Sequence, residues 1–188
     1  MNRIAALFLL GTLAGCSSAP EPNLDSTDPY ERYLGALSAA ESGDAEGLKR
    51  LDAQLKDGDA LARTGAIVAL SIAKPAGALE RITGMLNDPD PIVRAEAVRG
   101  ITRFRDPAST PALVKVLSAD ASVEPRRTAA RELCMFTDTP EVRTALLTAF
   151  SDPAAGVAYN AWRSLMLLTG RRDLPRTRAD AEEALKKS

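Results

Sequence analysis

Apolar residues recur every three or four positions from residue 48 onward, the spacing of one face of an amphipathic helix. Leu48, Leu51 and Leu55 form the first set. The set returns at a constant step, as Leu79, Ile82 and Leu86 and then as Thr110, Leu113 and Leu117; a fourth, less regular copy holds Val142, Leu146 and Phe150. The pattern predicts four similar helices.

A second repeated pattern lies between these helices. Four segments, 61–70, 92–101, 124–133 and 156–165, align on a shared alanine at Ala66, Ala97, Ala129 and Ala161, with nearly the same step each time. Asp, Ser and Pro residues precede the segments, and these residue types begin helices. Each unit is therefore predicted to be helix, turn, helix. Pro125 falls inside the third segment and is expected in the first turn of its helix.

A single helical pair cannot bury its apolar face, so the units must stack on one another. The sequence predicts an all-α fold, an α-solenoid of about four helical hairpins over residues 44–73, 75–105, 107–136 and 139–169. Cap helices are expected at both ends of the folded domain, residues 30–188: one over 29–42, with Tyr30, Tyr33, Leu34 and Leu37 facing inwards, and one over 178–187.

The segment DPDPIVRAEAVRGI, residues 88–101, strongly resembles a HEAT repeat of the short bacterial type that is also seen in bilin lyases. The resemblance covers residues 44–169, although the third unit departs by Pro125 and the fourth lacks the arginine. It implies a structural ladder in which an arginine of each unit pairs with an aspartate of a turn. The residues expected in this ladder are Arg63, Arg94 and Arg126, with Asp59 and Asp90 as partners.

The N-terminus carries a second resemblance. Arg3 precedes the apolar run 4–10, which is too short to span a bilayer, and Leu13-Ala14-Gly15-Cys16 follows. This order resembles the lipobox of bacterial lipoproteins, and the alternative is an ordinary signal peptide that contains a cysteine. The resemblance implies a signal peptide over 1–15, a covalent lipid on Cys16 and a cell-envelope location. Ser17 is typical of sorting to the periplasmic side of the outer membrane, if the host has two membranes. Residues 16–29, rich in Pro, Ser and acidic side chains, are predicted to be a disordered tether.

Charge and composition narrow the chemistry. Lys plus Arg number 24 and Asp plus Glu 25, so the net charge of −1 argues against nucleic-acid binding. The sequence has no histidine and no motif for nucleotide binding, zinc binding or hydrolysis. We therefore expect no metal, no cofactor beyond the lipid on Cys16, and no enzymatic activity. Cys134, in an apolar stretch, is expected to be buried and inert rather than reactive.

A second arginine row, Arg99, Arg131 and Arg163, repeats with the same step as the shared alanines, and stacking would align it on the concave face. With Arg103 and Glu96 one helical turn from Arg99, this row is a candidate binding strip for an acidic segment of a partner protein. The alternative is a solvated face partly neutralised by Glu96 and Glu132. Trp162, the one tryptophan, is either a core residue or an exposed anchor near the end of the array.

The function predicted from these features is a membrane-anchored envelope lipoprotein that acts as a non-catalytic protein-interaction scaffold. A structural spacer or assembly accessory of an envelope complex is the alternative. A bilin-lyase-like enzyme is a further alternative, since HEAT-like proteins include enzymes that attach or isomerise bilins. The sequence does not identify a protein partner or an oligomeric state.

Overall fold

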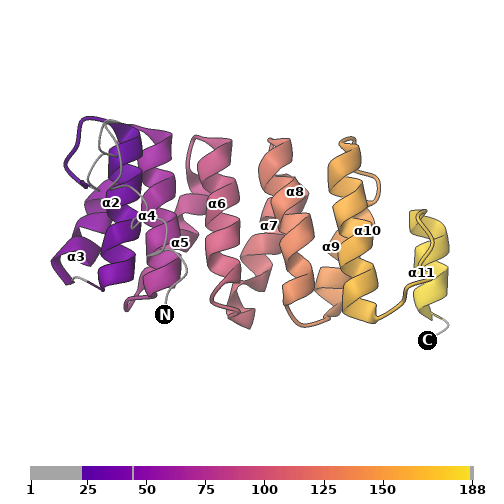
Figure 1. Ribbon diagram of the computed structural model, residues 1–188. Helices are drawn as coiled ribbons and strands as arrows, with labels where there is room; N and C mark the ends of the chain where they lie inside the picture. The colour runs from indigo at the N-terminus through magenta and orange to yellow at the C-terminus, as the bar shows by residue number, and fades with distance from the viewer. Residues whose placement is uncertain (1–22, 44, 187–188) are drawn as a thin grey trace, which may run out of the picture.

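The computed structural model describes residues 23–43 and 45–186. The predicted signal peptide and the lipidation residue Cys16 lie outside the described residues. Within that part of the chain there are ten α-helices, three short 3-10 helices and no strand. The architecture is the predicted all-α solenoid (Figure 1). None of the described helices is long and apolar enough to cross a membrane.

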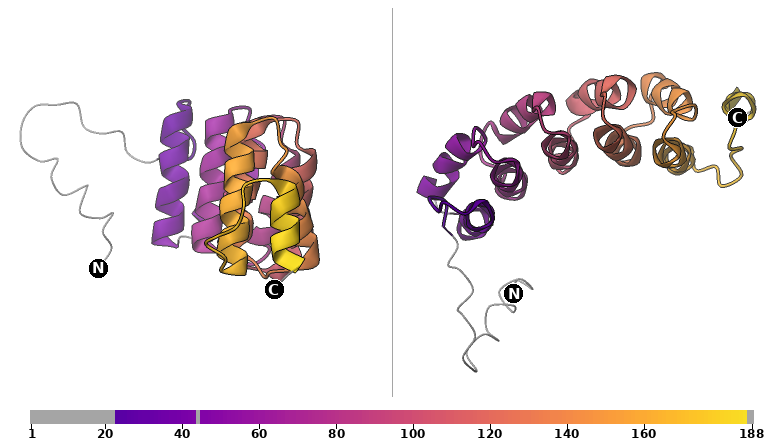
Figure 2. Two further views of the ribbon diagram at one scale, coloured as in Figure 1. Left: turned by 90° about the vertical axis from the view of Figure 1, so that its right-hand side faces the viewer. Right: turned by 90° about the horizontal axis from the view of Figure 1, so that it is seen from above.

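The helices alternate between two layers. The inner layer contains α2 (Pro29–Ser42), α4 (Ala60–Ala73), α6 (Pro91–Thr102), α8 (Val123–Glu132) and α10 (Ala155–Thr169). The outer layer contains α3 (Ala45–Gln54), α5 (Ala78–Gly84), α7 (Thr110–Ala119), α9 (Pro140–Ala149) and α11 (Arg178–Lys186). The 3-10 helices are η1 (Met85–Asn87), η2 (Pro107–Ser109) and η3 (Leu133–Met135). Seen from above, the layers follow a shallow arc whose concave side is formed by the inner layer (Figure 2).

The core lies between the two layers. The four aligned alanines, Ala66, Ala97, Ala129 and Ala161, are fully buried, as is the leucine or isoleucine one helical turn after each. The outer layer contributes Leu51, Ile82, Leu113 and Leu146, which are also fully buried. Small side chains at the shared alanine position let successive inner helices approach closely, and the larger residues fill the space between layers. The repeat seen in the sequence is therefore the repeat of the core.

The N-terminal helix α2 is more than a cap. It has an aspartate N-cap, Asp28, as α4 and α6 have, and an arginine, Arg32, at the position that Arg63, Arg94 and Arg126 occupy on later inner helices. A left-handed residue, Gly43, directly follows its last turn, as Gly170 follows that of α10. The helix is an inner-layer helix without an outer partner before it in the described chain. The predicted inward position of Tyr30 is wrong, because this side chain is 53% exposed and α2 buries Gly35, Ala36, Ala39 and Ala40 instead.

Residues 23–28 correct the predicted tether. Leu24 packs against the hydrophobic core, and Asn23 lies so close to Gly35 of α2 that an added Cβ there would sit 2.6 Å from its carbonyl carbon. This segment belongs to the folded body, although it was expected to be part of the disordered stretch 16–29. The segment is mostly polar and is flanked by proline, so it was predicted to be disordered although Leu24 packs against the core. Pro125, in contrast, lies in the first turn of α8 as predicted.

Candidate functional site

Four arginines, one from each of four successive inner helices, bridge neighbouring units. Arg63 of α4 donates two hydrogen bonds of 2.8 Å to the carboxylate of Asp88, in the turn of the next unit. The same bidentate hydrogen bonding joins Arg94 to Asp120 and Arg126 to Asp152. Arg32 of α2 donates a hydrogen bond to the carboxylate of Asp57. Each of these arginines also donates to a backbone carbonyl of the segment before its own helix. The arginine ladder thus ties consecutive units together.

The partners differ from the predicted ones. Asp59 and Asp90 do not pair with the ladder arginines; they cap α4 and α6 by accepting hydrogen bonds from the backbone N–H groups of Leu61 and Ile92. The turns before α4 and α6 each carry two aspartates near their ends, and the earlier one faces the arginine of the preceding unit. Because the guanidinium donors are committed to protein oxygens and the pairs from Arg63 onward are at most 14% exposed, the ladder is structural.

The ladder also shifts the titration of its acids. The hydrogen bond from Arg126 lowers the pKa of Asp152 against the opposing effect of burial. Burial raises the pKa of Asp120, but hydrogen bonds from Arg94 and from the backbone N–H of Ser122 outweigh it, so the pKa lies below its usual value. Both carboxylates are therefore charged in the folded protein at neutral pH.

The predicted binding strip on the concave face divides into two parts. Arg99 forms an ion pair of 2.7 Å with Glu96, and Arg131 forms one of 2.7 Å with Glu132. Arg163 is exposed on α10. Arg99 and Arg103 line one groove, whereas Glu96, Arg131 and Arg163 do not. The structure therefore does not gather the five predicted residues into a single site.

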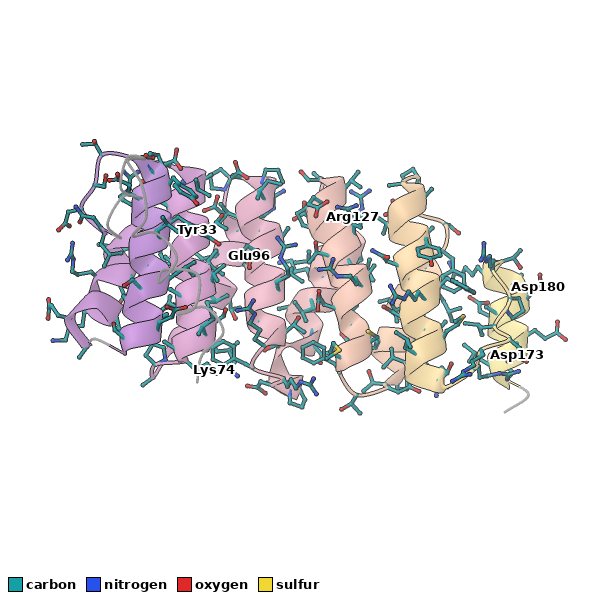
Figure 3. The ribbon with its side chains drawn as sticks, in the orientation of Figure 1. Tyr33, Lys74, Glu96, Arg127, Asp173 and Asp180 are labelled. Atoms are coloured by element: carbon teal, nitrogen blue, oxygen red, sulfur yellow. The ribbon has the colours of Figure 1, made fainter. Side chains whose placement is uncertain are left out.

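The groove lies where α4, α6 and η3 end, on the concave side, and has a volume of about 590 Å³. We call it the basic groove. It is lined by four cationic side chains and one carboxylate, the latter being Glu132, which is already paired with Arg131. The cations are Lys74, Arg99, Arg103 and Arg105. Figure 3 places Lys74 at the lower end of α4, with Glu96 farther up α6.

Contacts within the protein hold two of these cations in place. The Lys74 ammonium donates a 2.7 Å hydrogen bond to the carbonyl of Arg103 and lies 5.3 Å from the centre of the Phe104 ring. Arg103 donates to the hydroxyl of the buried Ser71. Among the described residues, no carboxylate pairs with Lys74, Arg103 or Arg105. The basic groove therefore carries positive charge that the described residues do not neutralise.

Apolar side chains stand on both sides of Arg103. Ile72 and Met135 line the basic groove and are 49% and 42% exposed. They occupy the position of Arg103 on the neighbouring inner units, and Leu167 continues the row on α10. A ligand with an apolar body and anionic groups would find complementary surface here. Lys74 and Arg105 were not predicted as site residues. Their signal in the sequence is that they follow Gly43 at one constant step; Lys74 directly follows α4, and Arg105 lies three residues after the end of α6.

A second cavity, Cys134 and the acidic side chains are weaker candidates for a functional site. A cavity of about 480 Å³ is lined by Asp88, Arg94 and Asp120 of the arginine ladder, whose charges are already paired. Cys134 is half-buried rather than buried, and its thiol donates to the carbonyl of Arg131. In the part of the chain that the structure describes, no three acidic or cysteine side chains gather as a metal site would need.

Trp162 lies between the two predicted alternatives. Its indole N–H donates a 2.9 Å hydrogen bond to the carbonyl of Leu174, and the guanidinium of Arg176 lies 4.6 Å from the ring centre. The side chain is half-buried and packs against the core. It fastens the segment between α10 and α11 to the last long inner helix.

Solved structures with a similar fold include a lyase complex and an engineered protein. The complex of CpcE and CpcF of phycocyanin lyase from Nostoc sp. matches with a TM-score of 0.66 and 22% identity, over 92% of this chain and 73% of that chain. An engineered protein matches with a TM-score of 0.57 and 20% identity, over 87% and 92% of the respective chains. No curated protein matches the sequence.

The match to a lyase complex contradicts the prediction that the chain is a non-catalytic protein-interaction scaffold. That prediction relied on the lack of histidine and of the usual catalytic motifs, and these absences do not identify a function. The family assignment has broader support. The family model for HEAT repeats matches residues 18–101, 79–165 and 110–188, and the chain belongs to the HEAT repeat family.

Proposed function

We propose that the chain has a bilin-lyase-like function and holds an open-chain tetrapyrrole in the basic groove. The carrying observation is the groove itself, about 590 Å³ in volume, with cations in excess and apolar residues beside them. A bilin is a long conjugated molecule with two propionate carboxylates, so it presents both kinds of surface. The groove volume falls in the range of about 300–1,000 Å³ that small-molecule sites occupy. The likeness to phycocyanin lyase supports the same ligand class.

The described side chains favour binding and orientation over proton transfer. The Arg103 and Arg105 guanidinium groups and the Lys74 ammonium attract carboxylates, and Ile72 and Met135 cover part of the apolar body. With no histidine in the sequence, no side chain of the basic groove has an ordinary pKa near neutrality. The chain would thus hold a bilin in one orientation for a reaction partner, which lowers the entropic barrier to reaction.

We further propose that the protein is a bacterial lipoprotein, with a lipid on Cys16 and a location at the cell envelope. The support is the order of Arg3, the apolar run 4–10 and Leu13-Ala14-Gly15-Cys16 in the sequence. Two or more acyl chains give a stable membrane anchor, whereas a single chain binds reversibly. Radiolabelled palmitate should enter the wild-type protein and not a Cys16→Ala variant. Equal labelling of the two proteins would overturn the lipid-anchor proposal and would leave the ligand proposal for the basic groove unchanged.

The ligand proposal is tested by titrating the full-length protein in detergent with biliverdin. Binding should shift the visible absorption of the bilin, and Arg103→Gln should weaken the affinity about tenfold or more, because one charge-assisted contact is lost. Arg163→Gln is the matched control: it makes the same charge change on an exposed arginine of the concave face outside the groove. No spectral shift with wild type, or equal weakening by the two variants, would overturn the proposal.

A further inference from the structure

A left-handed residue lies at or shortly after the end of four inner helices, α2, α4, α6 and α10. The residue that follows α2 is Gly43, with φ of 67°, and the residue that follows α10 is Gly170, with φ of 68°. Lys74 and Arg105 follow Gly43 at one constant step along the chain, and their φ values are 48° and 53°. Glycine is the residue that adopts this conformation without a steric penalty from a Cβ atom.

Lys74 and Arg105 are thus exceptions to the residue type that their backbone prefers. In residues 23–43 and 45–186 they are the two non-glycine residues with positive φ. Both line the basic groove, while the glycines at the matching ends of α2 and α10 do not. Strained residues that cluster at one concave site point to a role for their side chains there. The two backbone outliers are therefore a reason to ask what their side chains do at this end of the groove.

We propose that Lys74 and Arg105 form a paired carboxylate site that takes the two carboxylates of one ligand, with Arg103 between them. This inference rests on the proposed function in that it assigns the propionate end of the bilin. The two residues follow neighbouring inner helices at matching positions, and packed helices lie about 8–10 Å apart. Two cations that come from two different helices can each bind one of the two carboxylates of a single ligand.

The donors available fit this chemistry. Lys74 uses one of its three N–H bonds on the Arg103 carbonyl, which leaves two for a carboxylate. No hydrogen bond or ion pair of the Arg105 side chain is described, and its guanidinium can bind a carboxylate with two parallel N–H donors. Arg103 is anchored through Ser71 and keeps its other N–H groups free for the ligand.

The test uses glycine substitutions, because glycine accepts the left-handed backbone and removes only the side chain. Lys74→Gly and Arg105→Gly should each fold, and each should weaken biliverdin binding about tenfold. Biliverdin dimethyl ester has no free carboxylate. Wild type should therefore bind the ester about as weakly as the double variant, Lys74→Gly with Arg105→Gly, binds biliverdin. Arg163→Gln should bind both forms of the bilin as wild type does.

The outcomes separate this site from the bilin proposal. Equal wild-type affinity for biliverdin and its dimethyl ester would overturn the paired carboxylate site and leave the bilin function standing. If wild type binds neither bilin, the bilin function fails, and glutarate becomes the probe, followed by changes in backbone amide NMR signals. Saturable shifts around residues 74 and 105 that are lost in the double variant would support the site alone. No shift with glutarate would overturn it too.

Discussion

Arg105 has a left-handed backbone conformation, which glycine adopts more easily than arginine does. At φ of 53° the Cβ atom crowds the backbone, whereas glycine has no such penalty. Its side chain is exposed and makes no described contact that would offset this cost. An exposed surface arginine at this position is therefore a local destabilisation, of the kind found where function and stability conflict.

Replacing Arg105 with glycine should raise the free energy of unfolding by roughly 1 kcal/mol. The measurement is urea unfolding at pH 7, followed by circular dichroism. Arg103→Gly is the control, because Arg103 has an ordinary helical φ of −65° and glycine there should lower stability by roughly 0.5–1 kcal/mol. A loss of stability in Arg105→Gly would show that the side chain has a structural role.

The closeness of α2 and α4 depends on a single missing side chain. A Cβ added to Gly65 would lie 2.9 Å from the Cα atom of Tyr33, which is backbone and cannot rotate away. Gly84, at the end of α5, has helical φ and ψ and no atom within 4 Å of such a Cβ. The two glycines therefore offer opposite tests of how tightly the helices pack.

Gly65→Ala should lower the free energy of unfolding by about 1–3 kcal/mol, because α2 must move off α4. Gly84→Ala should raise it by about 0.4–1 kcal/mol, because alanine restricts the unfolded chain and meets no neighbour. Thermal unfolding of the two variants beside wild type measures both. Equal stability of Gly65→Ala and wild type would mean that the contact between α2 and α4 yields easily.

The arginine ladder makes the free energy of unfolding depend on pH. The folded-state pKa of Asp152 lies below its unfolded value of about 3.9, because Arg126 hydrogen-bonds the charged form. A lowered pKa contributes stability that is present above the unfolded value and is lost as pH falls through the folded value. The pair is largely buried, and breaking a buried pair is costly.

Asp152→Asn should therefore lower the free energy of unfolding by about 3 kcal/mol at pH 7. The deficit should shrink below about pH 4, as the wild-type carboxylate takes up a proton. Urea unfolding between pH 7 and pH 2.5 measures the difference between the two proteins. A deficit that stays constant over this range would mean that the charge of Asp152 contributes nothing and that packing alone explains the loss.

The helical repeat could be predicted from the sequence, because one spacing governs many residues. The aligned alanines and the repeated apolar sets between them predicted the helical hairpins, because every unit repeats the same pattern, and members of both series are fully buried. Prediction failed where nearby residues compete for one role. Asp88 and Asp90 stand in the same turn, and only the path of the backbone decides which one faces Arg63. Lys74 and Arg105 escaped notice because their distinguishing feature is a backbone angle.

At the scale of the whole molecule, charge is balanced overall and unbalanced locally. The net charge is −1, yet the basic groove holds three cations, Lys74, Arg103 and Arg105, that pair with no carboxylate of the described residues, while Arg99 is paired with Glu96. Four further arginines, those of the ladder, are paired with aspartates of neighbouring units. A ligand anion would therefore be attracted by a short-range field at the groove and not by the molecule as a whole.

Biliverdin affinity should consequently fall as salt rises, since the groove is open to solvent and the screening length shrinks from about 10 Å at 0.1 M to about 3 Å at 1 M ionic strength. We expect a loss of about tenfold over this range for wild type and little change for the dimethyl ester, whose binding uses apolar contacts. Arg105→Gly should flatten the salt dependence of the free acid, whereas Arg163→Gln should leave its slope as in wild type. Absorbance titrations at four salt concentrations measure these slopes. Equal salt dependence for the free acid and the dimethyl ester would mean that the carboxylates add no electrostatic attraction. The binding energy would then come from apolar contacts with Ile72 and Met135.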